Sequence, residues 1–317
     1  MGLHVPRVHK AKIELVDARM RVRAIVACVV VLAFHKPAAE AGSGSASPSA
    51  AGPASGLGAP VSDKNVERAT TIMNAQLGAL KNSQESALVD TFAKDAVVLV
   101  PTPRLAHGET TGLPAAIARL SPHDTLKSAT VTKLVAGSTA SAVWWSAEVN
   151  LVADSLEAAT HATNTTIRVT ELATADANWK VVAGAFAEIT APRMLADSDP
   201  IDDASTTAVG PLTPLAADVA KLDAALGSKV TVFGTDKGEA GWDAAASHAL
   251  LAKWKTLPFM LGGKPRAVAG KDWAFAITPI DWQQPKKKVP TRMSALVIGT
   301  PTAIGGWQVV AVQYTAN

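Results

Sequence analysis

The chain has 317 residues, of which 48% are hydrophobic and 18% are charged, and its formal net charge is +3. This length suits about two domains, and the hydrophobic content is sufficient for their cores. Residues 1–41 hold seven Lys or Arg but only three Asp or Glu, so the rest of the chain is close to neutral. The positive charge therefore does not favour nucleic-acid binding.

Residues 1–41 have the pattern of a secretory signal peptide. Two arginines precede an apolar run from Ala24 to Phe34, and Ala39-Glu40-Ala41 fits a small-x-small cleavage site. The run falls short of the ~20 residues that span a bilayer, which weakens the alternative of a membrane-anchoring helix. We therefore expect cleavage after Ala41 and a secreted or periplasmic bacterial protein, with Met20 as a candidate true start.

The only cysteine, Cys28, lies in the middle of this apolar run instead of at its end, which argues against a lipid anchor. Without the leader the chain has no thiol, so disulfides, cysteine metal sites and cysteine nucleophiles are excluded. The remaining histidines have no metal-pair spacing, and no nucleotide-binding or metalloprotease motif occurs. We therefore expect neither a metal nor a cofactor.

Residues 42–62 are almost entirely Gly, Ser, Ala and Pro, a composition typical of a flexible tether. A first domain is predicted over 63–195. Apolar residues at helical spacing predict one helix from Asp63 to about Leu80 and another over 84–92. A strand over 95–101, a glycine turn and a short helix over 113–120 follow. Further strands are expected at about 128–136, 141–153, 163–174 and 178–190.

The acidic, proline-containing segment 196–213 is interpreted as an interdomain linker, and a second domain is predicted over 214–317. This domain repeats the order of helices first and strands afterwards. Its helices are expected at 215–226 and 242–257, and its strands at 229–234, 264–269, 272–282, 289–299 and 306–315. Helices together with a long antiparallel meander give each half an α+β fold.

The two predicted domains repeat the same series of motifs. In the first half, Val135-Ala136-Gly137 precedes an aromatic strand, a later strand has Arg168 at its centre, and Trp179 follows the next turn. The second series consists of Val268-Ala269-Gly270, an aromatic strand, Arg292 and Trp307. A repeat at the scale of a domain indicates that the halves share one architecture. The first half is acidic and the second basic, which favours docking of one half on the other.

Three features of the first half carry a resemblance to a known family. They are the run Phe92-Ala93-Lys94-Asp95-Ala96-Val97, the turn glycines Gly108 and Gly112, and the closing run from Trp179 to Phe186. With a more diverged copy over 215–317, they resemble the SnoaL-like branch of the nuclear transport factor 2-like superfamily. The resemblance implies two cone-shaped domains, each a curved antiparallel sheet wrapped around N-terminal helices. It also implies that the cones pack as an internal pseudo-dimer, so the chain itself can be monomeric.

Glu148 is a candidate general base. Alternation along its strand places it on one face with Trp144, Ser146 and Asn150. If that face is the concave one, Glu148 lies at the pocket that such cones enclose; if it faces solvent, the residue has no special role. His107, ahead of the first turn glycine, is the other acid–base candidate, with an exposed loop histidine as the alternative interpretation.

Arg168 and Arg292 occupy equivalent places in the repeat. Each can bind a carboxylate ligand in a pocket or pair with an acidic residue, Glu148 or Asp281, across the sheet. Trp144 and Trp273 lie on the aromatic strands, where they can line a pocket or fill an interface between sheets. The candidate ligand contacts are therefore Trp144, Arg168, Trp273 and Arg292.

The fold does not specify a reaction, because related cones serve either catalysis or binding. Tyr314, the only tyrosine, lies on the last strand, which argues against the chemistry of the ketosteroid isomerases that the fold resembles. We expect binding of a small apolar or amphipathic molecule, or of a partner protein, without catalysis. The alternative is a cofactor-independent isomerase, cyclase or hydro-lyase that uses Glu148 or His107 in the first cone. A purely scaffolding pair of domains is a third hypothesis.

Overall fold

The computed structural model describes residues 63–99, 126–154, 162–189, 212–213, 215–283 and 291–316. The expected signal peptide and tether, His107, the helix expected over 113–120 and most of the expected linker lie outside these ranges. Within the described part of the chain, no helix is both long and apolar enough to cross a membrane.

The first domain consists of two helices and a five-stranded sheet. Its elements are α1 (Asp63–Lys81), α2 (Glu85–Val89), β1 (Phe92–Leu99), β2 (Leu126–Ser138), β3 (Ala142–Asp154), β4 (Ala162–Thr174), η1 (Ala175–Ala177) and β5 (Lys180–Ile189). The strand order is β1-β5-β4-β3-β2. The meander from β2 to β5 is antiparallel, as predicted, but β1 adds to β5 in parallel.

The second domain has the same plan. Its elements are η2 (Leu215–Ala217), α4 (Val219–Ala224), β6 (Leu226–Phe233), β7 (Ala240–Gly241), α5 (Ala244–Trp254), β8 (Phe259–Leu261), β9 (Arg266–Ala269), β10 (Ala274–Trp282), β11 (Thr291–Pro301) and β12 (Trp307–Ala316). The strand order is β7-β6-β12-β11-β10-β8, and β9 also pairs with β10. Here β6 takes the place of β1, because it pairs in parallel with β12.

Several element boundaries differ from the sequence prediction for local reasons. The helix expected over 242–257 begins only at Ala244, because the Asp243 side chain accepts a hydrogen bond from the backbone N–H of Ala246 and caps it. The helix expected over 84–92 ends at Val89, since Phe92 already pairs with Val181 in the sheet. The helix expected over 215–226 is divided into η2 and α4, and β8 was not predicted.

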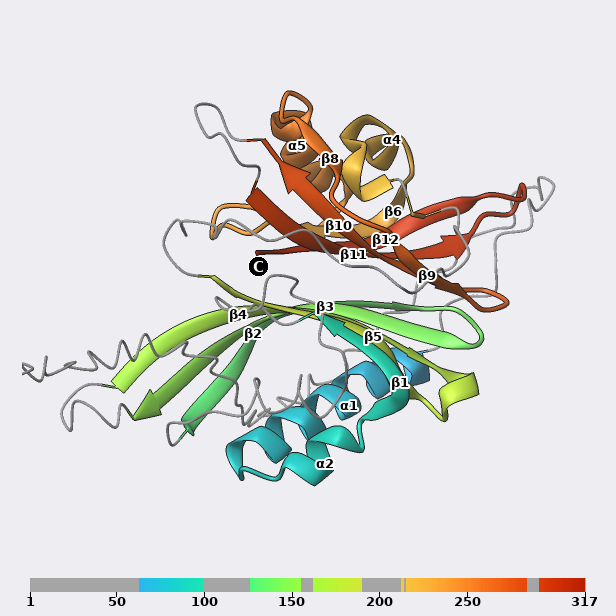
Figure 1. Ribbon diagram of the computed structural model, residues 1–317. Helices are drawn as coiled ribbons and strands as arrows, with labels where there is room; N and C mark the ends of the chain where they lie inside the picture. The colour runs from blue at the N-terminus through green and yellow to red at the C-terminus, as the bar shows by residue number, and fades with distance from the viewer. Residues whose placement is uncertain are drawn as a thin grey trace, which may run out of the picture.

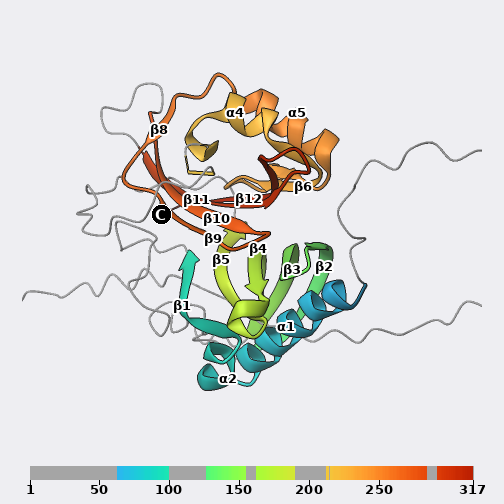
Figure 2. The ribbon, with the colours of Figure 1, turned by 90° about the vertical axis from the view of Figure 1, so that its right-hand side faces the viewer.

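The two sheets pack face to face, with α1 and α2 on the outer side of one and α4 and α5 on the outer side of the other (Figures 1 and 2). Each sheet encloses a separate apolar core with its own helices. A third apolar cluster lies between the sheets and includes Leu99, Leu172 and Ala185 from the first domain and Phe275 and Ile298 from the second. The predicted fold class, two α+β domains packed as an internal pseudo-dimer, is confirmed.

The repeated Val-Ala-Gly motif has a packing role at this interface. A Cβ atom on Gly137 would lie 2.5 Å from the Trp144 ring, and one on Gly270 would lie 2.3 Å from the Trp273 ring. In both copies the glycine therefore gives room for an indole that packs in the cluster between the sheets. The repeated motif in the sequence therefore reflects the same packing of glycine against tryptophan in both domains.

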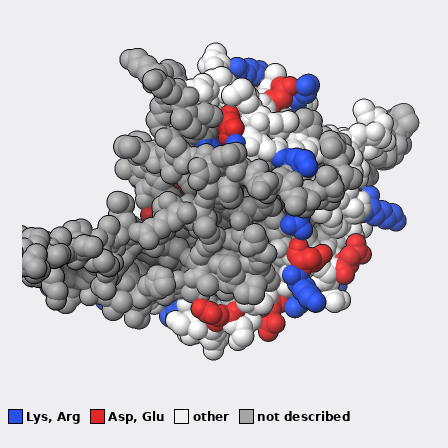
Figure 3. Space-filling view, viewed as in Figure 1, with Lys and Arg blue, Asp and Glu red and all other residues white. Residues whose placement is uncertain are grey.

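The contact between the domains includes an apolar part that the charge difference between the halves did not predict. The buried cluster between the sheets is apolar. On the face drawn in Figure 3, basic and acidic side chains of the described residues are interspersed instead of forming one basic and one acidic half. Apolar burial therefore contributes to the association of the domains.

Candidate functional site

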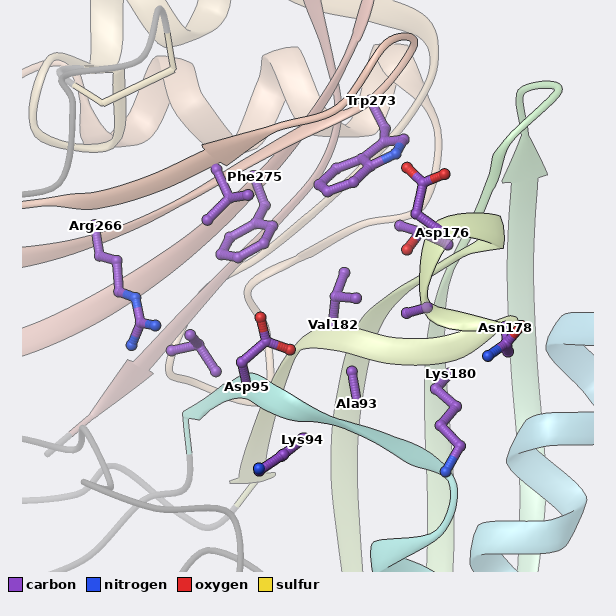
Figure 4. Close-up of a pocket in the computed structure, with 14 residues that line it drawn as sticks. Ala93, Lys94, Asp95, Asp176, Asn178, Lys180, Val182, Arg266, Trp273 and Phe275 are labelled. Carbon is purple, nitrogen blue, oxygen red and sulfur yellow. The ribbon is translucent and has the colours of Figure 1, made fainter.

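A pocket of about 500 Å³ opens between the two domains. Its first wall comes from β1, η1 and β5, and its second from β9 and the start of β10 (Figure 4). Both domains are needed to form it, because neither wall encloses the space alone. Apolar and charged side chains line it together, and its volume is in the range typical of small-molecule sites at domain interfaces.

Trp273 and Phe275 form the aromatic wall of this pocket. Their ring planes are 5° from parallel and their centroids are 6.4 Å apart. Trp273 is 6% exposed and Phe275 is 3% exposed, so packing holds both rings in place. The Gly270 backbone lies against the indole and donates its N–H to the Trp273 carbonyl. Trp273, a predicted ligand contact, is thus placed at a pocket by the fold.

Five charged residues line the same pocket: Lys94, Asp95, Asp176, Lys180 and Arg266. None of them forms an ion pair with another residue of the described part of the chain. In Figure 4 the carboxylates of Asp95 and Asp176 point toward the side of the aromatic wall, whereas the ammonium groups of Lys94 and Lys180 point away from it. The pocket therefore offers charges that no ion pair within the described ranges neutralises.

Arg168 links the first domain to the second through hydrogen bonds. Its guanidinium donates hydrogen bonds to the carbonyls of Gly234, Asp236, Lys237 and Glu239, all in the turn between β6 and β7, at 2.8–3.3 Å. The side chain is 1% exposed. Burial lowers the pKa of Arg168, and the neighbouring carboxylates oppose this shift. These contacts assign Arg168 to the interface between the domains.

Glu148 lies opposite Arg168 in the β3–β4 pair and accepts a hydrogen bond from its Nε at 3.0 Å. The strand face that holds Glu148, Ser146 and Trp144 is turned toward the second domain, since Ser146 Oγ contacts Thr231 Oγ1 at 2.6 Å. The polar face is therefore neither the concave face nor the solvent face considered from the sequence. Trp144 packs in the cluster between the sheets and does not line the pocket described above.

Arg292 makes the equivalent pair in the second domain. Its Nε and Nη2 donate to the two carboxylate oxygens of Asp281 at 2.7 and 2.9 Å. The two residues are register partners on β11 and β10. Of the two roles that the sequence left open for each mid-strand arginine, the structure shows the cross-strand pair in both domains.

Glu171 is a buried acid that was not among the site residues predicted from the sequence. It is fully buried on the inner face of β4, and its Oε1 accepts a hydrogen bond from Gln76 Nε2 of α1 at 2.9 Å. Its other oxygen, Oε2, has no hydrogen-bond partner within the described part of the chain. Burial raises the pKa of Glu171 to about 8, and the side chains of Gln76 and Trp145 only partly oppose this. A carboxyl in this environment is protonated near neutral pH.

A signal for Glu171 was present in the sequence. It lies in phase with Ile167, Val169 and Ala173, the apolar face of its strand, and these three side chains pack in the core of the first domain. A lone acid on an apolar face of a strand indicates a buried carboxyl. The pocket between the domains had no comparable signal, because its residues come from segments far apart in the sequence.

Among the described residues, no group of three or more His, Cys, Asp or Glu side chains could hold a metal ion. His107 lies outside the described residues, so its predicted role stays a prediction. The expected absence of a cofactor likewise stays a prediction.

The fold defines a two-domain α+β protein in which two curved sheets pack face to face. No family model matches the chain, and no curated protein matches it. Among solved structures, it is similar to an NTF2-like protein from Cytophaga hutchinsonii, with 18% identity over 38% of this chain and 95% of that chain, at a TM-score of 0.31. It is also similar to an NTF2-like protein of unknown function from Pseudomonas putida, with 18% identity, coverages of 32% and 73%, and a TM-score of 0.28.

Proposed function

We propose that this protein binds a small amphipathic molecule in the pocket between its domains, without catalysis and outside the cytoplasm. The observation that carries the proposal is a pocket of about 500 Å³ that is lined by an aromatic wall and by charged groups without an ion-pair partner among the described residues. Ligand sites combine apolar walls with a few placed polar groups in this way. The signal-peptide pattern of residues 1–41 supports the extracytoplasmic location.

The test uses N-phenyl-1-naphthylamine, an apolar dye whose fluorescence rises on binding. We expect the wild-type protein to bind it, with energy transfer from tryptophan, because Trp273 lies in the pocket wall. The variant Val268→Tyr places a bulky ring on a lining residue that is 38% exposed and should weaken binding about tenfold by filling the space.

The matched control is Ile304→Tyr, which changes an apolar residue that is 96% exposed and does not line the pocket. This variant should bind the dye as the wild type does. The proposal fails if the wild type does not bind the dye, or if the two tyrosine variants bind it equally well.

Glu171 favours a second candidate function, cofactor-independent acid–base chemistry in the first domain. It is a buried carboxyl with a raised pKa and, among the described residues, one oxygen without a hydrogen-bond partner, and such perturbed groups are common at acid–base sites. A test that does not need the natural substrate is deuterium exchange at the carbon next to the carbonyl of an apolar ketone in D₂O, followed by NMR. Protein-dependent exchange that disappears in Glu171→Gln, but not in Glu85→Gln, would favour this function, whereas no exchange above buffer would exclude such proton transfer for the ketone tested.

A further inference from the structure

We infer that the pocket between the domains prefers an organic cation, a molecule with an apolar body and an ammonium group. The inference rests on the proposed binding function and specifies the charge of the ligand. Two carboxylates, Asp95 of β1 and Asp176 of η1, line the same pocket as the aromatic wall. Aromatic faces and carboxylates are the two groups that proteins use to recognise ammonium ions.

The arrangement of the charges favours a cation over an anion. Lys94 and Lys180 also line the pocket, but in Figure 4 their ammonium groups point away from the aromatic wall. Arg266 lies at the opposite end of this wall from Asp176. A ligand that stacks on the indole of Trp273 would therefore meet a carboxylate before it meets a basic side chain.

Both carboxylates are available to a ligand. Neither Asp95 nor Asp176 is in an ion pair within the described part of the chain, and both are exposed. An ammonium group beside either carboxylate would gain an ionic contact that no other side chain of the described residues already occupies. Because the pocket is open to water, these contacts are screened by salt, and the affinity of a cation should fall as ionic strength rises.

The charge preference can be measured with three probes of similar shape. They are benzyltrimethylammonium, neopentylbenzene, in which carbon replaces the charged nitrogen, and the anion phenylmethanesulfonate. Each probe competes with N-phenyl-1-naphthylamine on the intact protein, and displacement of the dye gives its affinity. We expect the cation to bind about three- to tenfold more tightly than the neutral probe, from ionic and cation–π attraction together.

Two variants assign this preference to the carboxylates. Asp95→Asn and Asp176→Asn should each weaken the cation about two- to fivefold and leave the neutral probe unchanged, as expected for exposed ionic contacts. Asp90→Asn removes an exposed carboxylate outside the lining and should change neither affinity. All three positions are exposed, so the fold should tolerate the changes.

The outcomes separate this inference from the proposed function. If the dye binds but the neutral or anionic probe displaces it as well as the cation does, the cation preference is overturned while binding in the pocket stands. The same holds if the two asparagine variants keep the full preference for the cation. If the dye does not bind at all, both are overturned.

Discussion

Glu171 shows how a single residue can make the stability of the first domain depend on pH. The folded protein holds its carboxyl among apolar side chains, with a hydrogen bond from Gln76 and the indole of Trp145 nearby. Burial therefore favours the protonated form in the folded state, whereas the unfolded chain ionises this group at its ordinary pKa of 4.5. The folded state loses relative stability wherever only the unfolded chain has released the proton.

We expect the free energy of unfolding to fall as pH rises from about 4.5 to about 8, the two pKa values of Glu171. The total loss should be on the order of 5 kcal/mol, and no further loss should occur above the folded pKa. In Glu171→Gln this fall should be absent, because glutamine does not ionise. Urea unfolding of the first domain at pH 5, 6.5 and 8 measures the effect.

Glu85→Gln is the control, since Glu85 is an exposed acid on α2. This variant should keep the wild-type dependence on pH. Equal slopes for Glu171→Gln and the wild type would show that the carboxyl is not held in a protonated state.

At the scale of elements, the Val-Ala-Gly motifs fix how the aromatic strands pack. In the first domain Gly137 is the register partner of Trp144, and in the second the Gly270 N–H binds the Trp273 carbonyl across a tight turn. Both indoles then contribute to the cluster between the sheets. A side chain at either glycine would displace the indole from this cluster, because the rings lie within 2.5 Å of the position of a Cβ atom.

We expect Gly137→Ala and Gly270→Ala each to destabilise the protein by about 1–3 kcal/mol, the usual cost of overpacking. Gly78→Ala in α1 is the matched control. A Cβ atom there meets nothing within 4 Å, so this change should stabilise the helix by about 0.5–1 kcal/mol. Thermal unfolding gives the shift in Tm for each variant. If all three alanines acted alike, the packing role of the two glycines would be wrong.

At the scale of the whole molecule, Arg168 joins two domains whose common interface is otherwise mainly apolar. It binds four carbonyls of the β6–β7 turn and one carboxylate of its own sheet. Gln313 of β12 donates in return to the Arg168 carbonyl at 3.2 Å. Loss of the guanidinium would leave four carbonyls of the β6–β7 turn, of which that of Gly234 is buried, without this donor, which is more costly than losing the attraction itself.

We expect Arg168→Ala to lower the free energy of unfolding by about 3–5 kcal/mol, as when one partner of a buried charged network is removed. Arg168→Lys should restore only part of this loss, because an ammonium group cannot reach four carbonyls as a planar guanidinium does. Urea unfolding followed by tryptophan fluorescence compares the variants.

Glu148→Gln keeps the bonds from Arg168 to the turn and changes only a partly exposed ion pair, so it should cost about 1 kcal/mol or less. A loss as large as that of Arg168→Ala would assign the stability to the ion pair within the first sheet. In that case the contacts between the domains would not be the main role of Arg168.

Much of the architecture could be read from the sequence. The helical spacing after Asp63, the strand patterns from 126 onward and the repeated motifs predicted two α+β halves, and cross-strand partners were correct for both mid-strand arginines. The linker was less well defined. Leu212 was assigned to the linker but is fully buried in the core of the second domain. The sequence did not indicate this, because a single apolar residue in a polar segment has no periodic pattern that would show what it packs against.

The order of most helices and strands, the duplication and the alternation of side chains along each strand follow from local periodicity and could be inferred from the sequence. Which face of each strand packs against which neighbour depends on contacts between distant segments, so it became known from the structure. The tertiary structure turned the polar face of β3, with Glu148, toward the second domain, and it left Glu171 as the buried acid. Packing of the domains also brought Asp95, Asp176 and Trp273 together around one pocket, because that site forms only where the two domains meet.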